Sequence, residues 1–480
     1  MELRDGPDQA GGSGPRARRV LVVSHYASER NGGEGSIPLR LFGRLRARGV
    51  EAWLLTHVSA RAELSQLLPA ADFKRVIFAR GLRGFGPIFT WGERLPAGLR
   101  TIAWGITQLE RQVAMVPVAR RLVRELAIDV VHQPISVSPV IPSPLTRLGA
   151  AVVMGPLNGG MELPPAFAGR DSALYALTKA VRPVAATALN RLMRGRPEAD
   201  VVLVANDRTR SLLPRSARRN VTEVSDMGVV LASWLVPDEL PADGPPPEDG
   251  PPPEDGPPPV SGPPPASGPP PASGPPPGGE SRPARFLFLG RLVGWKGVDI
   301  LLDAFALARE QVPASLEIVG DGPERARLAE QADRTGRGAD VSFRGWLDPA
   351  ECARRMQACD AYVSASLQES GGIAVLEAMA CARPVIVSAW GGHLASVDAA
   401  VGVLADVSSR DILVREMADA MVRLARDPGL RARLGASGRR RVEARYDWDV
   451  ILDRTLAVYD EAVASYAGGG ISRARPASRV

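Results

Sequence analysis

Residues 366–393 of the chain read SLQESGGIAVLEAMACARPVIVSAWGGH, a glycine-rich loop followed by a helical pattern. Glu369 stands on the predicted loop and Glu377 inside the predicted helix, which we expect to begin near Gly372. Paired glycines let the backbone approach a ligand closely, and the free N–H groups of a helix start attract an anion such as phosphate. Carboxylates need hydrogen-bond donors, and sugar hydroxyls meet that need. The alternative is an ordinary helix start with a solvated glutamate.

Length and composition predict two domains in a reducing compartment. The 480 residues exceed the usual limit of about 250–300 residues for one core. The net charge is +6, and the basic residues are interspersed with acidic ones. The chain shows no basic, aromatic-rich motif of a nucleic-acid-binding module. We therefore expect anionic ligands or a membrane surface, and no nucleic acid. An odd number of cysteines in apolar segments favours the cytoplasm: Cys352, Cys359 and Cys381.

The ends of the chain carry no obvious targeting signal. Residues 1–19 lack the apolar core of a signal peptide, so we expect a disordered leader. No uncharged apolar run approaches the roughly 18 residues that cross a bilayer. A basic amphipathic helix is predicted over residues 170–196, with a solvated face packed on the sheet or, alternatively, a contact with an acceptor or a membrane. A cytoplasmic location therefore leaves a peripheral contact at the inner face of the membrane open.

The N-terminal part alternates strand and helix patterns. A strand at 20–24, a glycine loop at 31–35 and a helix ending at Gly49 precede a second strand at 51–56, which predicts a βαβ unit of a parallel sheet. Pro38 stands where the dinucleotide-binding fingerprint needs Gly or Ala, so a nicotinamide site is not favoured. Further strands are predicted at 128–132, 150–155 and 200–205.

A low-complexity segment separates this part from the next. From Gly244 to Pro277 the sequence contains six G-P-P-P blocks, and two residues separate each block from the next. Glycine at every sixth position, not every third, excludes a collagen helix. In polyproline II geometry, at about 3.1 Å per residue, the segment would reach roughly 100 Å, so it cannot fix the domain geometry. We expect a semi-extended linker and, as a hypothesis, a tether to a partner that recognises polyproline.

The C-terminal part again alternates strands and helices, which predicts a second open α/β domain. Strands are predicted at 285–290, 315–319, 340–344, 361–364 and 384–388. Residues 298–310 and 411–467 have helical patterns, and Trp448 and Tyr459 are the expected packing anchors of the last. The predicted organisation is a leader (1–19), an N-terminal domain (20–235), a Pro/Gly-rich linker (236–283), a C-terminal domain (284–465) and a disordered basic tail (466–480).

Four motifs in the C-terminal part resemble the retaining glycosyltransferases of family 4. They are FLGRLVGWKG, IVGDGP, ESGGIAVLEAMACARPVIVSAWGG and RYDWD, in that order. The N-terminal part is similar more weakly, through NGGEG, VVHQPISVSP and GPLNGGMELPPAF, which resemble one subgroup of that family. The resemblance implies a GT-B fold, in which two Rossmann-like domains face each other across a cleft.

The resemblance also implies roles for residues of the C-terminal domain. Arg291 and Lys296 match the basic pair that binds the donor diphosphate and stabilises the leaving group, a role that suits fixed cations. Glu369 would contact hydroxyls of the transferred sugar and Glu377 those of the ribose. Backbone N–H groups would face the phosphates or the sugar at Gly371, Gly372 and Ile373.

Residues of the N-terminal domain complete the implied site. Gly33, with Gly32 beside it, would let the first loop approach the donor phosphate or the acceptor. His132 matches a histidine near the reacting centre, although a histidine at a strand end is more often a plain loop residue. Asn158 and Gly159 are candidates for the acceptor side.

No metal ion is expected at this site. Asp447, Trp448 and Asp449 spell the Asp-x-Asp pair of metal-dependent transferases, but we interpret them as the start of a helix. The four histidines have no ligand spacing. Ser370 and Ala382 depart from the family pattern, which weakens any inference about the sugar.

The sequence therefore predicts an enzyme that moves a sugar from a nucleotide-diphosphate sugar to an acceptor hydroxyl with retention. The nucleotide sugar is a substrate, and no cofactor is expected. The family suggests a saccharide or lipid-linked acceptor in polysaccharide, lipopolysaccharide or glycolipid assembly. Two alternatives stay open: a non-catalytic GT-B binding protein whose Pro-rich segment recruits partners, and an epimerase or phosphorylase of the same fold.

Overall fold

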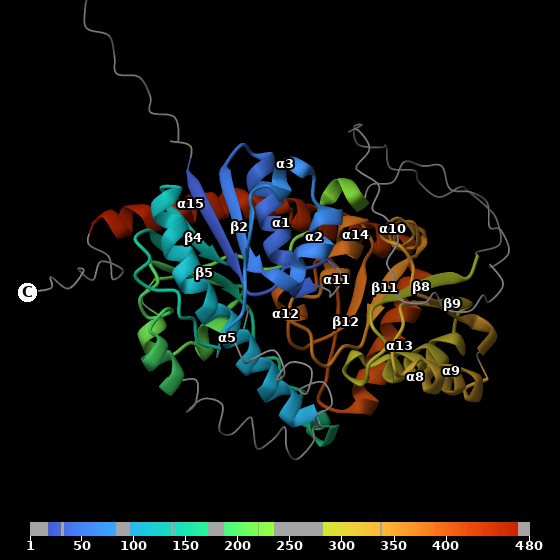
Figure 1. Cartoon of the computed structure of the whole chain (residues 1–480). Coiled ribbons are helices and arrows are strands. Elements are labelled where there is room, and N and C mark those ends of the chain that lie inside the picture. The colour runs from blue at the N-terminus through green and yellow to red at the C-terminus, as the bar shows by residue number, and fades with distance from the viewer. Residues whose placement is uncertain are drawn as a thin grey trace, which may run out of the picture.

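The computed structural model describes residues 18–29, 33–82, 97–135, 138–139, 141–170, 187–218, 220–234, 282–336 and 338–468. These residues form two lobes, each built around a parallel sheet (Figure 1). The predicted leader, most of the tail, the repeats and much of the predicted helix 170–196 lie outside the described residues, although 187–193 are helical.

Seven parallel strands form the N-terminal sheet of the described residues, in the order β3-β2-β1-β4-β5-β6-β7. They are β1 (Arg19–Ser24), β2 (Glu51–His57), β3 (Val76–Ala79), β4 (Val130–Gln133), β5 (Ala151–Leu157), β6 (Val201–Val204) and β7 (Val221–Glu223). The helices of this lobe are α1 (Gly33–Ala47), α2 (Arg61–Leu67), α3 (Ala70–Phe73), α5 (Ala97–Glu125) and α7 (Asp207–Leu212). The predicted βαβ start is confirmed, whereas the short strands β3 and β7 were not predicted.

Alternation along the strands explains how both faces of this sheet are covered. Val20 and Val22 of β1 point into one apolar cluster, with Phe42 of α1. Leu21 and Val23 point into another, which α5 covers. Because successive side chains of a strand point to opposite faces, an all-apolar strand needs helices on both sides. These β-branched runs therefore form a central parallel sheet.

Six parallel strands form the C-terminal sheet of the described residues, in the order β10-β9-β8-β11-β12-β13. They are β8 (Ala284–Leu289), β9 (Ala314–Val319), β10 (Val341–Gly345), β11 (Ala361–Ser364), β12 (Val385–Ser388) and β13 (Gly402–Ala405). The helices are α8 (Val298–Arg309), α9 (Arg325–Arg334), α10 (Pro349–Ala358), α11 (Ile373–Ala380), α12 (His393–Ser396), α13 (Arg410–Arg426) and α14 (Pro428–Arg445). The five predicted strands are confirmed, and β13 was missed.

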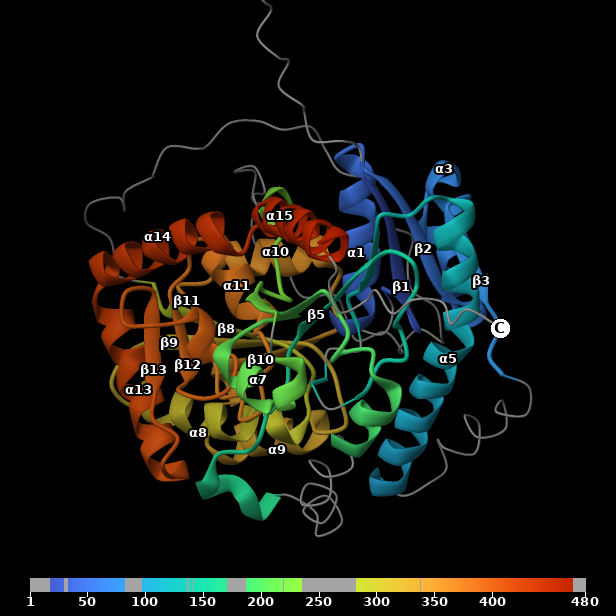
Figure 2. The same cartoon turned by 90° about the vertical axis from the view of Figure 1, so that its left-hand side faces the viewer.

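The last helix, α15 (Trp448–Ala467), follows the C-terminal lobe in the chain but packs on the N-terminal sheet. Trp448 and Tyr459 are buried among β-strand residues such as Val130 and Val153, so both are packing anchors, as predicted. Figures 1 and 2 show α15, in red, lying along the N-terminal strands near α1. Asp447 caps this helix through its side chain, which confirms the interpretation of a helix start.

The chain crosses between the lobes at two places that lie side by side. Val229 and Asp447 form an isolated parallel bridge. The Val229 amide donates to the Tyr446 carbonyl at 2.8 Å, and the Trp448 amide donates to the Val229 carbonyl at 3.2 Å. The first crossing therefore ends before the Pro-rich repeats begin.

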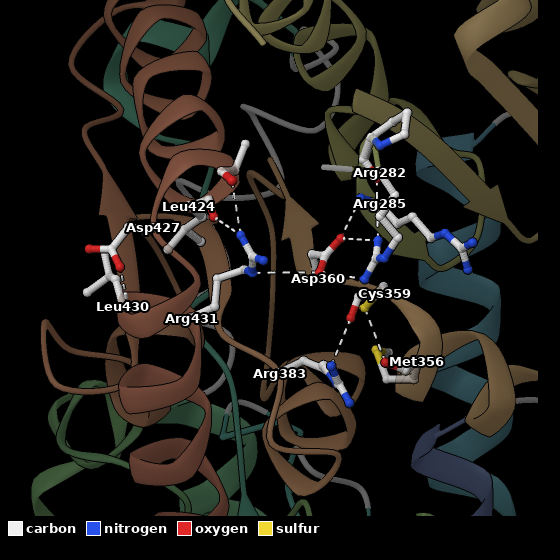
Figure 3. Close-up of polar contacts among 12 residues, drawn as sticks. Arg282, Arg285, Met356, Cys359, Asp360, Arg383, Leu424, Asp427, Leu430 and Arg431 are labelled. Atoms are coloured by element: carbon white, nitrogen blue, oxygen red, sulfur yellow. Dashed lines mark hydrogen bonds and ion pairs between the residues drawn. The ribbon is translucent and has the colours of Figure 1, made fainter. Parts of the chain in front are cut away.

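Both flanks of the Pro-rich segment are fastened to the C-terminal lobe. The carbonyl of Trp234 accepts a hydrogen bond from the Gln357 amide at 2.8 Å. Beyond the repeats, Arg282 donates to both carboxylate oxygens of Asp360, at 2.7 and 3.0 Å. Figure 3 shows Asp360 between Arg282 and Arg431, whose Nε lies 3.6 Å from it. Gln357 and Asp360 are three positions apart, or at most about 11 Å along the chain. The two flanks are thus anchored close together.

Candidate active site

The site begins where the strand order of the C-terminal sheet reverses, between β8 and β11. In open parallel sheets ligands bind outside the carboxyl ends of the strands at such a point. β8 ends at Leu289 and leads to Arg291 and Lys296, and β11 ends at Ser364 and leads to Glu369. The topology therefore brings the predicted basic residues and the first glutamate to one edge of the sheet.

A tight turn fixes the Lys296 loop. Gly297 has φ of 64°, and a Cβ at this position would lie 2.2 Å from the carbonyl oxygen of Ala365. Only glycine fits a left-handed conformation at such a close approach. The Leu367 amide donates to the Trp295 carbonyl at 2.8 Å and so ties this loop to the one that carries Glu369.

Lys296 and Glu369 form an ion pair. The Nζ of Lys296 lies 2.6 Å from Oε2 of Glu369, and both side chains are largely buried. Burial by itself raises the pKa of the Glu369 carboxyl, but the Lys296 charge and hydrogen bonds from Lys296 and the Gly372 amide outweigh it and hold this pKa below its ordinary value. Glu369 is therefore a carboxylate at neutral pH, fixed beside a cation.

The glycine pair positions the start of α11 as predicted. Gly372 is the N-cap residue, with φ of 64° and ψ of 54°, and the helix begins at Ile373. A Cβ on Gly371 would lie 2.3 Å from Cγ of Met227, in the segment that joins the lobes. The amides of Gly371, Gly372 and Ile373 thus lie at a helix N-terminus in contact with the other lobe, where an anion is stabilised.

Glu377 lines a small cavity between the lobes, with a volume of about 170 Å³. Arg40 of α1 and Ile373 share this cavity, and the side chain of Glu377 makes no hydrogen bond or ion pair within the described residues. Burial raises the pKa of the Glu377 carboxyl to about 7, against the lowering effect of the Arg40 charge. The carboxyl group is therefore able to accept hydrogen bonds from a ligand.

A larger cavity of about 670 Å³ lies beside it, also between the lobes. The N-terminal wall includes Asn158 and Arg208, and the C-terminal wall includes Gly371 and Trp390. The indole Nε1 of Trp390 donates to the carbonyl of Glu162 at 2.6 Å across the two lobes. The two cavities give the molecule a ligand-sized cleft at the predicted place.

Asp226 forms the wall that the two cavities share. Its carboxylate oxygens accept hydrogen bonds from Nδ2 of Asn158, at 3.0 and 2.9 Å. The Oδ1 of Asn158 accepts in turn from Arg208 at 3.3 Å. Burial raises the pKa of the Asp226 carboxyl to about 6, although the Asn158 hydrogen bond lowers it. Asn158, which was predicted to lie on the acceptor side, therefore holds the Asp226 carboxylate in place.

Gly159, the other acceptor-side candidate, takes part in the same network through its backbone. Its amide donates to Oγ1 of Thr209 at 3.2 Å, and its carbonyl accepts from Nε of Arg208 at 3.0 Å. A Cβ on Gly159 would lie 2.2 Å from Cδ of Pro139. A side chain at this position would displace the loop that presents Asn158.

The structure does not bring His132 into either cavity. Its side chain is only 1% exposed, and both ring nitrogens are occupied, by the Tyr459 hydroxyl and by the Gly155 carbonyl, each at 2.6 Å. Burial lowers the pKa of His132 to about 4, so the ring is neutral. His132, which matched a site residue of the family, therefore lies beneath α15, where Tyr459 covers its ring.

Three further predicted residues, Arg291, Gly33 and Gly32, are less well connected to the site. Arg291 is exposed just beyond β8, and its side chain has no hydrogen-bond or ion-pair partner in the described part of the chain. Gly33 is the first residue of α1, and Gly32 lies outside the described residues.

Two candidate site residues were not predicted from the sequence: Asp226 and His393. Asp226 follows a strand of only three residues, and its partner Asn158 is 68 positions away. His393 is fully buried beside the start of α11, and its Nε2 has no hydrogen-bond partner in the described structure. His393 closes the stretch 366–393, so its place in the motif was the available signal. No group of three or more His, Cys, Asp or Glu that could hold a metal ion occurs among the described residues.

Residues 276–441 match the protein family described as Glycosyl transferases group 1. The C-terminal lobe carries a domain of this kind. Two curated relatives are D-inositol 3-phosphate glycosyltransferase of Salinispora arenicola, 35% identical over 190 residues, and phosphatidyl-myo-inositol mannosyltransferase of Mycobacterium tuberculosis, 34% identical over 185. These matches cover 37% and 38% of this chain, and the chain spans 41% and 48% of the lengths of the two relatives.

Solved structures match almost the whole chain. Sucrose-phosphate synthase of Thermosynechococcus elongatus superimposes with a TM-score of 0.60 at 19% identity, covering 93% of this chain and 100% of that one. A glycosyltransferase of Rickettsia africae gives 0.60 at 13% identity and covers 93% and 99%. The two Rossmann-like lobes therefore have the GT-B fold, as predicted. Within the described residues no helix has the length and apolar character to span a membrane.

Proposed function

We propose that the chain is a retaining glycosyltransferase that moves a sugar from a nucleotide-diphosphate sugar to an acceptor hydroxyl. The observation that carries the proposal is the Lys296–Glu369 pair, 2.6 Å apart, at the reversal of strand order and beside the start of α11. Glu377 lines the smaller of the two cavities between the lobes, and the larger one is lined by Ser370 and Gly371, which follow Glu369 in the chain. A cation, a helix N-terminus and two carboxyl groups match the diphosphate and the hydroxyls of such a donor.

In the proposed reaction the diphosphate lies against the start of α11, with Lys296 and Arg291 beside it. Their fixed charges stabilise the negative charge that develops on the leaving group. Glu369 orients the sugar through its hydroxyls, and Glu377 holds the ribose. The acceptor hydroxyl attacks from the face that the diphosphate leaves, and the diphosphate takes its proton. Positioning in the cleft supplies most of the remaining acceleration.

The pathway and the donor are narrower proposals. We place the chain in polysaccharide, lipopolysaccharide or glycolipid assembly, acting in the cytoplasm on a saccharide or lipid-linked acceptor. A relative from Corynebacterium glutamicum is named as GDP-mannose-dependent, and the Anabaena neighbour HepE was solved in complex with UDP, so both bases are candidates. A peripheral contact with the inner face of the membrane is supported by Leu192, which is 79% exposed between Arg191 and Arg194. Cosedimentation with anionic vesicles tests it, and no pelleting would exclude it.

The test of the activity combines binding and transfer. We expect UDP, GDP or ADP to bind in a calorimetric titration and the matching nucleotide sugar to be consumed. Lys296→Ala and Glu369→Ala should each lower the transfer rate at least about 100-fold at an unchanged thermal midpoint, because each removes a group aimed at the reacting atoms. Lys74→Ala, at an exposed position on the N-terminal lobe, is the matched control.

Two outcomes would contradict the proposal. Rates within a few-fold of wild type in both site variants would overturn the site. Failure of every nucleotide to bind would instead favour the non-catalytic GT-B binding protein, whose Pro-rich segment recruits partners.

A further inference from the structure

Asp226 holds a position that no motif assigned. It is only 4% exposed as a residue, yet its atoms line both the small cavity of Glu377 and the large cavity of Trp390. In the proposed function the donor ribose lies on Glu377 in the small cavity, so an acceptor in the large cavity would meet the donor at the wall that Asp226 forms.

Asn158 fixes the orientation of the Asp226 carboxylate. Asn158 donates one N–H group toward both oxygens, at 3.0 and 2.9 Å. Asn158 is itself held by Arg208 at 3.3 Å and by Asn206 at 3.5 Å. A carboxylate has about four lone-pair sites, so the Asn158 amide and the backbone hydrogen bond from Asp226 itself leave capacity for a ligand hydroxyl. Hydrogen bonds from a hydroxyl to a carboxylate are among the stronger neutral–charged ones.

The charges around the large cavity indicate what kind of molecule fits. Its lining includes three arginines and four carboxyl groups: Arg208, Arg445, Arg454, Glu162, Asp207, Glu223 and Asp226. Positive charge is therefore not in excess, and a phosphate in this cavity would face carboxylates as well as arginines. The ring of Trp390 adds an apolar face. Mixed donors and acceptors around an aromatic ring suit a molecule rich in hydroxyls.

We propose that the large cavity binds the acceptor as an uncharged saccharide and that Asp226 accepts a hydrogen bond from a hydroxyl beside the reacting one. This inference rests on the proposed glycosyltransferase function. It separates the chain from the two relatives whose names specify an inositol phosphate and a phosphatidylinositol. Asn158 and Arg208 act as positioning residues, because they reach the acceptor only through Asp226.

The first test is an acceptor panel, run with the nucleotide sugar that the enzyme consumes. The panel contains neutral mono- and oligosaccharide glycosides, myo-inositol phosphate and vesicles of phosphatidylinositol, and mass spectrometry detects the products. We expect transfer to neutral saccharides. Transfer to the phosphorylated acceptors alone, or to no neutral saccharide, would overturn the inference. Nucleotide binding, measured separately, shows whether the proposed function still stands.

The second test isolates Asp226. Asp226→Asn keeps the shape of the side chain, and we expect at least a tenfold rise in KM for the acceptor with less than a twofold change in Kd for the nucleotide. Asn158→Ala, which leaves the carboxylate but removes its holder, should raise the same KM to a smaller extent. Asp453→Asn, an identical change at an exposed position of α15, should leave both constants unchanged. Equal losses of nucleotide and acceptor binding in Asp226→Asn would overturn the assignment.

A pH profile adds a readout that a merely structural role would not change. Burial raises the pKa of Asp226 to about 6, with Glu34 raising it and Asn158 and Arg208 lowering it. The acceptor-dependent rate of the wild type should therefore fall below about pH 6, where the carboxylate becomes protonated. This acidic limb should be absent in Asp226→Asn, and its persistence there would assign the limb to another group.

Discussion

Glu377 couples ligand binding to stability at the scale of a single residue. Its carboxyl group lines the small cavity without a partner in the described structure, and burial raises its pKa from 4.5 to about 7. Because the folded state holds this proton more tightly than the unfolded chain, the associated stability is present below about pH 4.5. It is lost as the pH rises through about 7, where the buried carboxylate becomes charged.

Glu377→Gln should therefore stabilise the protein at high pH and weaken the site. We expect the free energy of unfolding to rise by about 1–3 kcal/mol at pH 8 and to change little at pH 5, as urea denaturation would measure. Nucleotide affinity should fall about tenfold, because an amide replaces a carboxylate that accepts hydroxyls more strongly.

Glu461→Gln, at an exposed position of α15, is the control for this change. A gain in stability of equal size at pH 5 and pH 8 would show that ionisation of Glu377 is not its cause.

Some residues of the site could be predicted from the sequence, and others could not. Lys296 and Glu369 belong to motifs with fixed spacing, and the structure places them 2.6 Å apart. Asp226 could not be found, because Asn158 contacts it only after β5 and β7 are placed in one sheet. His132 matched a family position, but the sequence does not show that Tyr459, 327 positions later, closes over its ring.

At the scale of elements, α15 belongs to one lobe by sequence position and to the other by packing. Tyr459 is completely buried among residues of the N-terminal sheet, and its hydroxyl contacts Nδ1 of His132. Deleting a large buried ring leaves a cavity and also leaves the histidine nitrogen without its partner. The helix should therefore contribute to the stability of the N-terminal lobe.

Tyr459→Ala should lower the free energy of unfolding by about 3–5 kcal/mol, in line with other aromatic truncations in cores. Hydrogen exchange should quicken first in β4 and β5, not in the C-terminal sheet. Glu461→Ala, on the exposed side of the same helix, should have little effect on exchange. Faster exchange confined to β8 and β11 would assign α15 to the C-terminal lobe.

Most strands followed from the apolar pattern, but the strands β3, β7 and β13 and the 29-residue helix α5 were not predicted. The three strands contain four, three and four residues, which is short for a pattern with a period of two. Each lies at an edge of its sheet, where one neighbour suffices. Their partners in the sheet, and not their own sequences, make them strands.

At the scale of the whole molecule, the Pro-rich segment is not what connects the lobes. The lobes are joined at Val229 and Asp447, while Trp234 and Arg282, on either side of the segment, both contact the C-terminal lobe. From the sequence we expected the repeats to lie between two domains without setting their geometry. The sequence could not show that both flanks are fastened within a few residues of each other, since those contacts join distant parts of the chain.

Replacing residues 244–277 by a short Gly-Ser segment should therefore leave the fold and the site intact. We expect a thermal midpoint within about 2 °C of wild type, because no described contact of either lobe is removed. Nucleotide affinity should stay within twofold. Arg282→Ala provides the contrast, since it strips Asp360 of its bidentate partner and should lower the midpoint. Loss of nucleotide binding in the shortened chain would show that the repeats support the cleft.

The contact between Arg282 and Asp360 also fixes where one flank of the Pro-rich segment lies relative to the site. Asp360 lies at the beginning of β11 and Glu369 beyond its end, so Arg282, which binds Asp360, lies at the edge of the sheet opposite to the site. A strand of six residues such as β8 separates those edges by about 20 Å. A module fused close to Arg282 would therefore start on the side of the C-terminal sheet that faces away from the site. Fluorescent or affinity modules inserted there would mark the protein without obstructing the site.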